Sequence, residues 1–110
     1  MHKIIKKPWG TEEILTNNSN YIFKKLYMKK NQRCSLQLHK KKIETIYVLS
    51  GLLEVQINKK FHILKKGNTI IIKNNVIHRM KALRDNTFYL EASSPHFMDV
   101  VRIEDDYRRL

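Results

Sequence analysis

The sequence predicts an all-β domain made of two packed sheets, and a jelly roll is the simplest such arrangement. Short runs rich in β-branched and aromatic residues follow one another at the spacing of roughly 8–12 residues that is typical of a sandwich or barrel. Turn-forming residues separate these runs, and no run shows the periodicity of an amphipathic helix. With 110 residues, the chain is expected to form a single domain over residues 1–110 that can bury its own core.

The first half of the chain contains four of the expected strands. The runs YIFKKLYM (21–28) and CSLQLH (34–39) mix apolar and polar residues in the manner of half-buried strands. The run ETIYVLS (44–50) alternates clearly, and Ser50-Gly51 forms the turn that separates it from LLEVQI (52–57).

Four further strands are expected in the second half. KFHIL (60–64) follows the turn at Asn58-Lys59, and TIII (69–72) follows Lys66-Gly67; its three successive isoleucines predict a strand that is covered on both faces. IHRMKA (77–82) and TFYLEA (87–92) are separated by Asp85-Asn86, and Ser94-Pro95 ends the last strand. The C-terminal VRIEDDYRRL (101–110) is expected to form a short turn or to fray.

Composition restricts the possible environments of the protein. A hydrophobic content of 42% fits a soluble globular protein, and MHKIIKKPWG at the N-terminus lacks the apolar run of a secretory signal. No stretch approaches the length needed to cross a bilayer, so we expect no membrane association. The single cysteine, Cys34, suits a reducing cytoplasm and is interpreted as a small buried apolar residue.

The charge balance favours an anionic partner. Lysine and arginine number 22 against 10 acidic residues, which gives a net charge of +12. The lysines occur in scattered pairs rather than on one helix or beside exposed aromatic residues, so nucleic acid is not the expected partner.

Polar side chains with ligand chemistry gather on two expected strands that follow each other along the chain. Gln37 and His39 share one face of their strand, because alternate residues point the same way. If Glu44 lines the same interior, three nitrogen or oxygen donors surround one point, and His78 supplies a possible fourth. Such a set suits zinc, iron, manganese, cobalt or nickel, and it can leave a position open for water or substrate. The alternative is that His39 and His78 are ordinary polar residues at strand ends.

Two motifs make this arrangement specific. Residues 31–51 resemble the first cupin motif, with Gln37 in place of its first histidine, His39 as its second, and Glu44 and Gly51 at the matching intervals. Residues 67–78 resemble the second cupin motif and end at His78. The departures from the two motifs are Asn31, Lys73 and Asn75, and asparagine can still adopt the positive φ that a turn needs at position 75.

The stretches KPWG, SLQLH, IETIYVLSG and DVVRIEDDYRR together resemble the C-terminal cupin domain of type II phosphomannose isomerases, which many bacteria fuse behind a GDP-mannose pyrophosphorylase domain. The resemblance implies a cupin-type jelly-roll barrel, also called a double-stranded β-helix, with one divalent metal, usually zinc. Its implied ligands are Gln37, His39, Glu44 and His78. The sequence departs from the family pattern at Lys42, Thr45, Ile46 and Arg108, where the family has Arg, His-Trp and Gly. The first three departures lie where substrate selectivity is set.

Three functions follow as hypotheses. The first is an aldose–ketose isomerase that acts on a sugar phosphate, as phosphomannose isomerase does. The second is a non-catalytic, metal-containing module that binds a sugar or a sugar nucleotide. The third is an Fe(II) oxygenase that uses His39, His78 and Glu44. A metal-independent sugar epimerase would not need the four donors.

The expected ligand of the first two hypotheses is a small anionic sugar. Lys42, Arg102 and Arg109 are candidates to receive its phosphate, and Tyr107 is a candidate to line the mouth of the site. The general base is not assigned: Glu91 points outward if Phe88 and Leu90 face the core.

The remaining expectations concern packing and assembly. Trp9 is expected to anchor the N-terminal segment against the barrel. We expect a homodimer, as in related cupins, and a cytoplasmic location. His2, His62 and His96 have no comparable partners in the sequence and are assigned no role.

Overall fold

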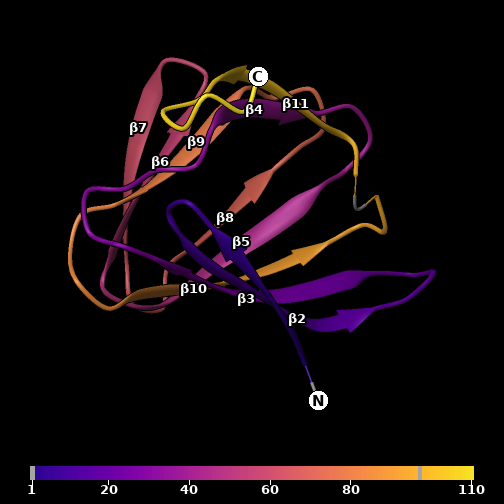
Figure 1. Cartoon of the computed structure of the whole chain (residues 1–110), viewed down its shortest axis with the longest axis horizontal. Coiled ribbons are helices and arrows are strands. Elements are labelled where there is room, and N and C mark those ends of the chain that lie inside the picture. Colours follow the sequence, from indigo (N-terminus) through magenta and orange to yellow (C-terminus); the bar gives the residue numbers. More distant parts are fainter. Residues whose placement is uncertain (1, 97) are drawn as a thin grey trace.

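The computed structural model describes residues 2–96 and 98–110, which form two antiparallel sheets packed face to face (Figure 1). The strands are β1 (Lys3–Lys7), β2 (Gly10–Asn17), β3 (Ile22–Met28), β4 (Leu36–His39), β5 (Glu44–Ser50), β6 (Leu52–Ile57), β7 (Lys60–Lys65), β8 (Thr69–Ile72), β9 (His78–Ala82), β10 (Thr87–Ser93) and β11 (Val100–Glu104). One sheet has the order β1-β2-β3-β10-β5-β8, and the other has the order β11-β4-β9-β6-β7. The all-β double sheet is therefore confirmed. In the part of the chain that the structure describes, no helix is long and apolar enough to span a membrane.

All eight expected strands are present, but three further strands were not expected. The hairpin β1–β2 extends the six-stranded sheet beyond β3, and β11 pairs with β4 where a turn or a frayed end was expected. The expectation that both faces of β8 are covered is wrong, since Ile71 is 64% exposed. Because successive residues of a strand point to opposite faces, Ile70 and Ile72 pack against the core while Ile71 lies on the outer face of the sheet.

Positive φ angles occur at several of the expected turns. Asn75 has φ of 63°, as expected, and Asn31, which replaces the first motif's glycine, has φ of 66°. Gly51 has φ of 78°, and a Cβ at this position would lie 2.5 Å from the Cα of Thr87, so the turn between β5 and β6 requires glycine.

Arg108, the residue that replaces a family glycine, has φ of 59°. A side chain in this left-handed region is strained by roughly 1–2 kcal/mol. We therefore expect Arg108→Gly to raise the free energy of unfolding by about 1 kcal/mol, because glycine relieves the strain but adds entropy to the unfolded chain. Urea denaturation measures the change. Arg84→Gly, at an exposed position without a positive φ, is the matched control and should lower stability.

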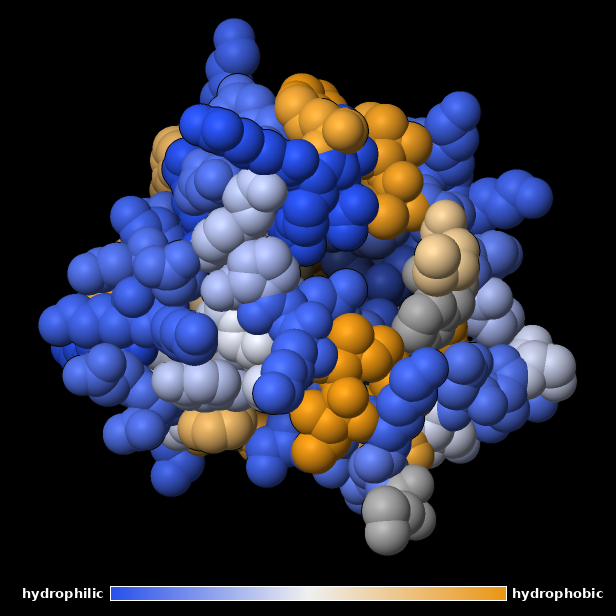
Figure 2. Space-filling model, in the orientation of Figure 1, coloured by the Kyte–Doolittle hydropathy of each residue, from blue (hydrophilic) through white to orange (hydrophobic). Residues whose placement is uncertain are grey.

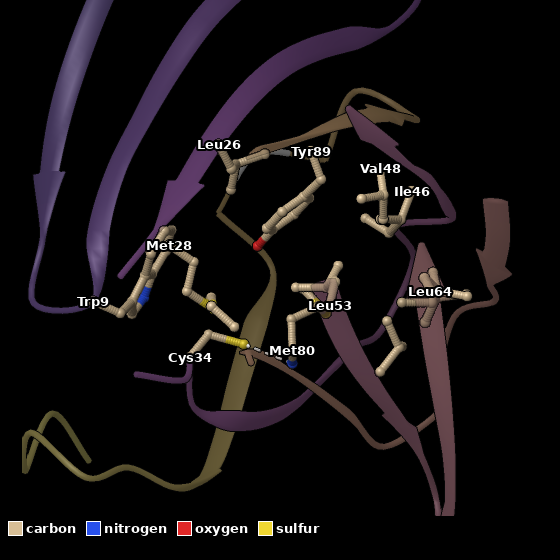
Figure 3. Packing of buried hydrophobic residues seen from close by; sticks show 13 residues of the cluster. Trp9, Leu26, Met28, Cys34, Ile46, Val48, Leu53, Leu64, Met80 and Tyr89 are labelled. Carbon is tan, nitrogen blue, oxygen red and sulfur yellow. Dashed lines mark hydrogen bonds between the residues drawn. The ribbon is translucent and has the colours of Figure 1, made fainter. Parts of the chain in front are cut away.

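The apolar core lies between the two sheets (Figure 3). Trp9 is 4% exposed and packs in this core, as expected for an anchor of the N-terminal segment. Cys34 is also buried, which confirms its interpretation as a core residue. Burial raises the pKa of its thiol to about 11, and its Sγ accepts a hydrogen bond from the backbone N–H of Met80 at 3.3 Å. The thiol is therefore protonated at neutral pH.

Two arginine–carboxylate pairs fasten the residues that follow β11. Arg33 donates from Nε and Nη2 to Asp106 at 2.7 and 2.9 Å. Arg109 makes the same two-pronged contact with Asp105, at 2.7 and 2.9 Å. Bidentate pairs of this kind fix geometry as well as adding energy. The Arg33–Asp106 pair connects the C-terminal residues to the segment before β4, and the Arg109–Asp105 pair fixes the conformation within the C-terminal residues themselves.

The Asp105–Arg109 pair predicts a defined acid sensitivity. Hydrogen bonds from Arg109 lower the pKa of the Asp105 carboxyl, whose side chain is 0% exposed, from 3.8 to about 2. A lowered folded-state pKa contributes stability that is present above about pH 4 and is lost as the pH falls toward 2. Urea midpoints measured from pH 6 to pH 2 test this expectation. Asp105→Asn should be less stable than the wild type at pH 6, and its stability should decrease less than that of the wild type as the pH is lowered. Asp85→Asn, in an exposed turn, is the control. Parallel curves for wild type and Asp105→Asn would contradict the assignment.

Candidate metal centre

Inward-pointing side chains from both sheets meet at one end of the barrel. Gln37 and His39 lie on β4, and His78, at the start of β9, is the cross-strand partner of Gln37. Glu44, at the start of β5, comes from the opposite sheet. The two expected strands that follow each other along the chain therefore lie in opposite sheets: residues 40–43 carry the chain from one sheet to the other, so Glu44 faces the other donors across the interior.

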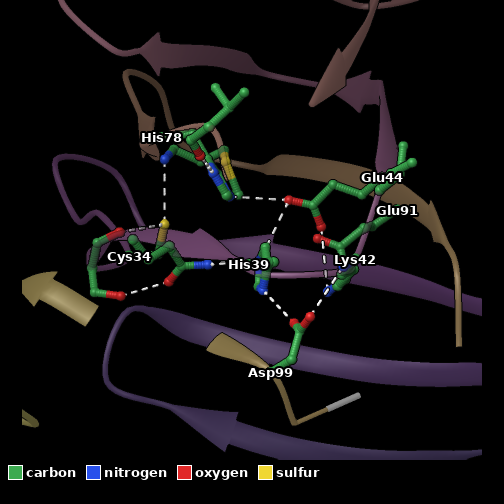
Figure 4. Close-up of polar contacts among 12 residues, drawn as sticks. Cys34, His39, Lys42, Glu44, His78, Glu91 and Asp99 are labelled. Atoms are coloured by element: carbon green, nitrogen blue, oxygen red, sulfur yellow. Dashed lines mark hydrogen bonds and ion pairs between the residues drawn. The ribbon is translucent and has the colours of Figure 1, made fainter. Parts of the chain in front are cut away.

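His39, Glu44 and His78 form a cluster that can hold a metal ion (Figure 4). One ligand atom from each lies within 4.8 Å of the others. Nε2 of His78 is 3.1 Å from Oε1 of Glu44, and Nε2 of His39 is 3.8 Å from the same oxygen. All three side chains are buried, with Glu44 1% and His78 0% exposed. Buried charge and imidazole at such short range are the usual surroundings of a cation.

Hydrogen bonds on the far side of each imidazole favour one tautomer. Nδ1 of His39 lies 3.2 Å from Oδ1 of Asp99, and Nδ1 of His78 lies 2.9 Å from the carbonyl oxygen of Val76. In each case Nδ1–H can donate to the oxygen, which leaves the Nε2 lone pair directed at the cluster. Histidine ligands of metals commonly have such a partner.

The hydrogen bonding of the buried polar atoms in the cluster indicates whether the site suits a metal ion. Both carboxylate oxygens of Glu44 and Nε2 of His78 are buried and make no regular hydrogen bond among the described residues; Oε1 lies 3.1 Å from Nε2 of His78 and Oε2 lies 3.3 Å from Nζ of Lys42. A carboxylate that faces two imidazole lone pairs is unfavourable unless a proton or a cation lies between them. The residues therefore fit a divalent cation. Carboxylate and imidazole ligands do not by themselves select one metal from zinc, iron, manganese, cobalt and nickel.

Gln37 stands at the edge of the cluster. Its Nε2 is 3.4 Å from Nε2 of His39, and its Oε1 accepts a hydrogen bond from Oγ of Ser35 at 2.5 Å. Amide oxygen and nitrogen are assigned from hydrogen bonding, and a rotation of the amide by 180° would direct the oxygen at the cluster while Nε2 donates to Ser35. Ser35 can therefore support Gln37 in either orientation, and ligation by Gln37 remains a prediction.

Burial and neighbouring charges keep one imidazole neutral. Burial, followed by the charge of Lys42 and the proximity of His78, lowers the pKa of His39 to about 4. His39 is therefore neutral at pH 7, as a metal ligand must be. Burial also acts to lower the pKa of His78, but its contact with Glu44 outweighs that effect and raises it. Without a metal, His78 and Glu44 are thus suited to share a proton.

Asp99 supports the cluster from outside. Besides its contact with His39, its Oδ2 accepts hydrogen bonds from the backbone N–H groups of Lys41 and Lys42, at 2.7 and 3.0 Å. Loss of such a partner typically lowers metal affinity about 10- to 100-fold, so Asp99→Asn is expected to weaken zinc binding by that factor. Competition with a chromophoric chelator measures the affinity. Asp85→Asn is the control, and equal affinities of both variants would exclude a role for Asp99.

Further charges form a row on the inner face of the six-stranded sheet. This charge row consists of Lys7, Glu12, Lys24, Glu91, Lys42 and Glu44, in which lysines and carboxylates alternate. Lys42 Nζ is 3.3 Å from Oε2 of Glu44 and 3.3 Å from Oε2 of Glu91. Lys24 Nζ is 2.7 Å from Oε1 of Glu12 and 3.7 Å from Glu91. The alternation lets several charges remain buried together.

The expected outward direction of Glu91 is wrong. Glu91 is 5% exposed and Tyr89 is fully buried, whereas Phe88 and Leu90 lie on the outer face of the sheet. The nearby lysines compensate the carboxylate: burial alone would raise the pKa of Glu91, but Lys42 and Lys24 lower it to about 2. On the outer face, Phe88 is partly covered because its ring lies 4.9 Å from that of Tyr27.

A cavity of about 200 Å³ opens beside the cluster. Figure 2 shows a mainly hydrophilic face with a hollow between the two sheets. The lining includes two cluster-side residues, five cations, two carboxylates, five core residues, and the exposed Met98 and partly exposed Val100. The first four groups are Gln37 and His39; Lys7, Lys24, Lys42, Arg102 and Arg109; Glu12 and Glu91; and Trp9, Leu26, Cys34, Met80 and Tyr89. Of the four expected substrate contacts, Lys42, Arg102 and Arg109 line the cavity. Among the described residues, Tyr107 does not line it; its hydroxyl bonds to the side chain of Gln32.

Four residues of the site were not expected from the sequence. Glu12 lies on β2, a strand that was not expected, and Asp99 lies in the connection to β11. Lys24 and Tyr89 lie on expected strands, and alternation with Ile22 and Leu26 could have indicated that Lys24 points inward.

Comparisons with known proteins agree with this geometry. A model of the family described as mannose-6-phosphate isomerase C-terminal matches residues 1–105. The xanthan biosynthesis protein XanB of Xanthomonas campestris pv. campestris is 29% identical over 112 residues, which cover 98% of this chain and 24% of that protein. The mannose-1-phosphate guanylyltransferase ManC of Salmonella typhimurium is 28% identical over 114 residues, which cover 100% of this chain and 24% of that protein. The chain thus spans about a quarter of the length of these curated relatives.

A solved structure supports the fold. An RmlC-like cupin from Shewanella frigidimarina has a TM-score of 0.80 at 18% identity, and the match covers 89% of this chain and 87% of that one. The resemblance read from the two sequence motifs is therefore confirmed at the level of fold and family. The chain adopts the cupin fold and belongs to the mannose-6-phosphate isomerase C-terminal family.

Proposed function

We propose that this protein is a metal-dependent cupin that binds a phosphorylated sugar in the cavity and interconverts its aldose and ketose forms. One observation carries the proposal: the same cavity is lined by His39 of the metal cluster and by Arg102. Arg102 is a cation that forms no ion pair with any of the described residues. At about 200 Å³ the cavity is small compared with sites for drug-sized ligands, which suits a monosaccharide better than a larger molecule.

Arg102 is the best candidate for the phosphate contact. Its position opposite Gln37 in the β11–β4 pair directs it to the same interior, and its buried Nε has no hydrogen-bond partner among the described residues. The other cations are already compensated: Lys42 contacts Glu44 and Glu91, and Arg109 is held by Asp105. A planar guanidinium can bind phosphate in a bidentate manner, so Arg102 is the leading one of the three candidates.

The chemistry requires a metal, which we propose to be zinc, and a base. His39, Glu44 and His78, with Gln37 as a further donor, would hold the ion, which polarises oxygens adjacent to the reacting carbons. A carboxylate must then move a proton between neighbouring carbons, and the two carboxylates that line the cavity are Glu12 and Glu91. Each of these carboxylates has a lysine amino group within reach, Lys24 for Glu12 and Lys24 and Lys42 for Glu91, which stabilises its ionised form.

A non-catalytic binding module is the second candidate, and one observation favours it. Glu91 has a pKa of about 2 and Glu12 lies 2.7 Å from Lys24, so both carboxylates are held in ion pairs. A carboxylate with so low a pKa is a weak base. Binding without turnover would then account for the same metal cluster and the same Arg102.

Metal analysis, binding and turnover together test the proposal. Protein purified without added metal is analysed for bound metal, and the zinc-loaded protein is titrated with mannose 6-phosphate by calorimetry. The interconversion of mannose 6-phosphate and fructose 6-phosphate is followed by proton NMR. Zinc with turnover supports the isomerase, binding alone supports the module, and iron with oxygen consumption would instead support an oxygenase. Failure to bind any of a panel of hexose phosphates would overturn the isomerase, and failure to bind a panel of sugars and sugar nucleotides as well would overturn the binding module.

Arg102→Met separates the phosphate contact from the metal site. The variant should retain its metal and its fold while losing at least tenfold in affinity for the sugar phosphate, since a charge-assisted bond contributes roughly 1.5–3 kcal/mol. Arg79→Met is unsuitable as a control because Arg79 supports the fold through the carbonyl of Cys34. Arg84→Met, at an exposed turn, is the matched control.

A further inference from the structure

Tyr89 places a hydroxyl without a partner inside the cavity. Its side chain is fully buried, it lines the cavity, and its OH group has no hydrogen-bond partner among the described residues. Figure 3 shows the ring projecting from β10 into the interior between the two sheets, with the oxygen at its inner end.

A buried hydroxyl without a protein partner needs an explanation, because buried polar groups are normally hydrogen-bonded. Phenylalanine would fill nearly the same space without a polar group that needs a partner. The other partnerless donor of the cavity, Nε of Arg102, is assigned above to a phosphate. Two unsatisfied groups in one cavity indicate a ligand that offers both an anion and a further polar atom.

The position of Tyr89 relative to the metal cluster is fixed by the register of β10. Ser93 is the cross-strand partner of Glu44, Glu91 pairs with Ile46, and Tyr89 pairs with Val48. The inward residues of β10 therefore lead stepwise from the cluster to Glu91 and then to Tyr89. Tyr89 lies where the polar lining meets apolar residues of the core, Leu26, Cys34 and Met80.

We propose that Tyr89 forms a hydrogen bond with a hydroxyl group of the bound sugar, at a subsite separate from the phosphate contact of Arg102 and from the metal cluster. This inference rests on the proposed function and specifies its ligand as a polyhydroxylated sugar phosphate rather than a simple anion. A phenol both donates and accepts, as a sugar hydroxyl does, so the two groups match in either direction. Because burial holds the pKa of Tyr89 well above its usual value, the phenol stays neutral and serves as a polar contact rather than as a base.

Tyr89→Phe tests the proposal, with Tyr27→Phe as the matched control on the outer face of the neighbouring strand β3. In the absence of ligand, Tyr89→Phe should melt at or above the temperature of the wild type, because it removes an unsatisfied hydroxyl. A lower melting temperature would show that the hydroxyl has a structural partner, and it would overturn the proposal.

Binding measurements with two different ligands distinguish the Tyr89 subsite from the phosphate subsite. With zinc-loaded protein, calorimetry should give roughly tenfold weaker binding of mannose 6-phosphate to Tyr89→Phe, and unchanged binding of inorganic phosphate. Tyr27→Phe should match the wild type with both ligands. If Tyr89→Phe binds mannose 6-phosphate as tightly as the wild type, or weakens both ligands equally, the Tyr89 subsite is wrong while the proposed function stands. If the wild type binds no hexose phosphate, the proposed function fails and the Tyr89 subsite fails with it.

Discussion

Replacement of His39 by alanine is expected to remove most of the bound metal while leaving the β-fold intact. The substitution takes away one of three buried ligand atoms that lie within 4.8 Å of one another. The carboxylate of Asp99 also holds the imidazole ring of His39 in place, and alanine offers no ligand atom at this position. Elemental analysis of the purified variant measures the metal, and far-UV circular dichroism measures the fold.

His62→Ala provides the matched control, since His62 is an exposed histidine on β7 in the same sheet as β4. It should retain as much metal as the wild type. The zinc-free forms of the wild type and of His39→Ala should have similar unfolding midpoints in urea, while added zinc should raise only the wild-type midpoint strongly. Unchanged metal content in His39→Ala would show that the cluster is not the metal site.

The core of the metal cluster could be predicted from the sequence because strand geometry has a period of two. Alternation places Gln37 and His39 on one face, and it places Glu44 on the buried face of β5 with Ile46 and Val48. The turn at residues 74 and 75 leads directly into β9, so His78 enters the barrel at the same end. Local patterns and spacing are sufficient for these steps.

The arrangement of the sheets could not be read in the same way. Whether consecutive strands share a sheet depends on contacts between distant residues, and β4 and β5 prove to lie in opposite sheets. The strands β1, β2 and β11 were not expected, since charged and exposed residues interrupt their apolar pattern. Without β2, the partner of Lys24 was unknown.

The prediction that the Glu91 side chain points outward was wrong for a related reason. Both faces of β10 carry large apolar side chains, and a carboxylate is normally assigned to the solvent side. Burial becomes acceptable only because Lys42, from the connection between the two sheets, and Lys24, from β3, both reach it. Such charge compensation between distant residues exists only in the folded molecule, and no local sequence pattern predicts it.

Glu91→Gln is therefore expected to destabilise the zinc-free protein by about 3 kcal/mol or more, which is typical when one member of a buried charge group is removed. Glu91 is 5% exposed and lies within 3.7 Å of the amino groups of both Lys24 and Lys42, so its replacement removes one buried carboxylate from two buried lysines. Urea denaturation monitored by Trp9 fluorescence measures the loss.

The matched control is Glu54→Gln, a partly exposed glutamate on β6, which should change the free energy of unfolding by less than about 0.5 kcal/mol. A second substitution then tests the cause. If the excess positive charge is responsible, Lys42→Met should be less destabilising in the Glu91→Gln background than in the wild type. In that background the amino group of Lys42 has lost one of its two carboxylate contacts, so its removal costs less. Additive losses, or a loss below about 1 kcal/mol for Glu91→Gln alone, would mean that the charge row does not act as a coupled unit and that Glu91 is stabilised by packing.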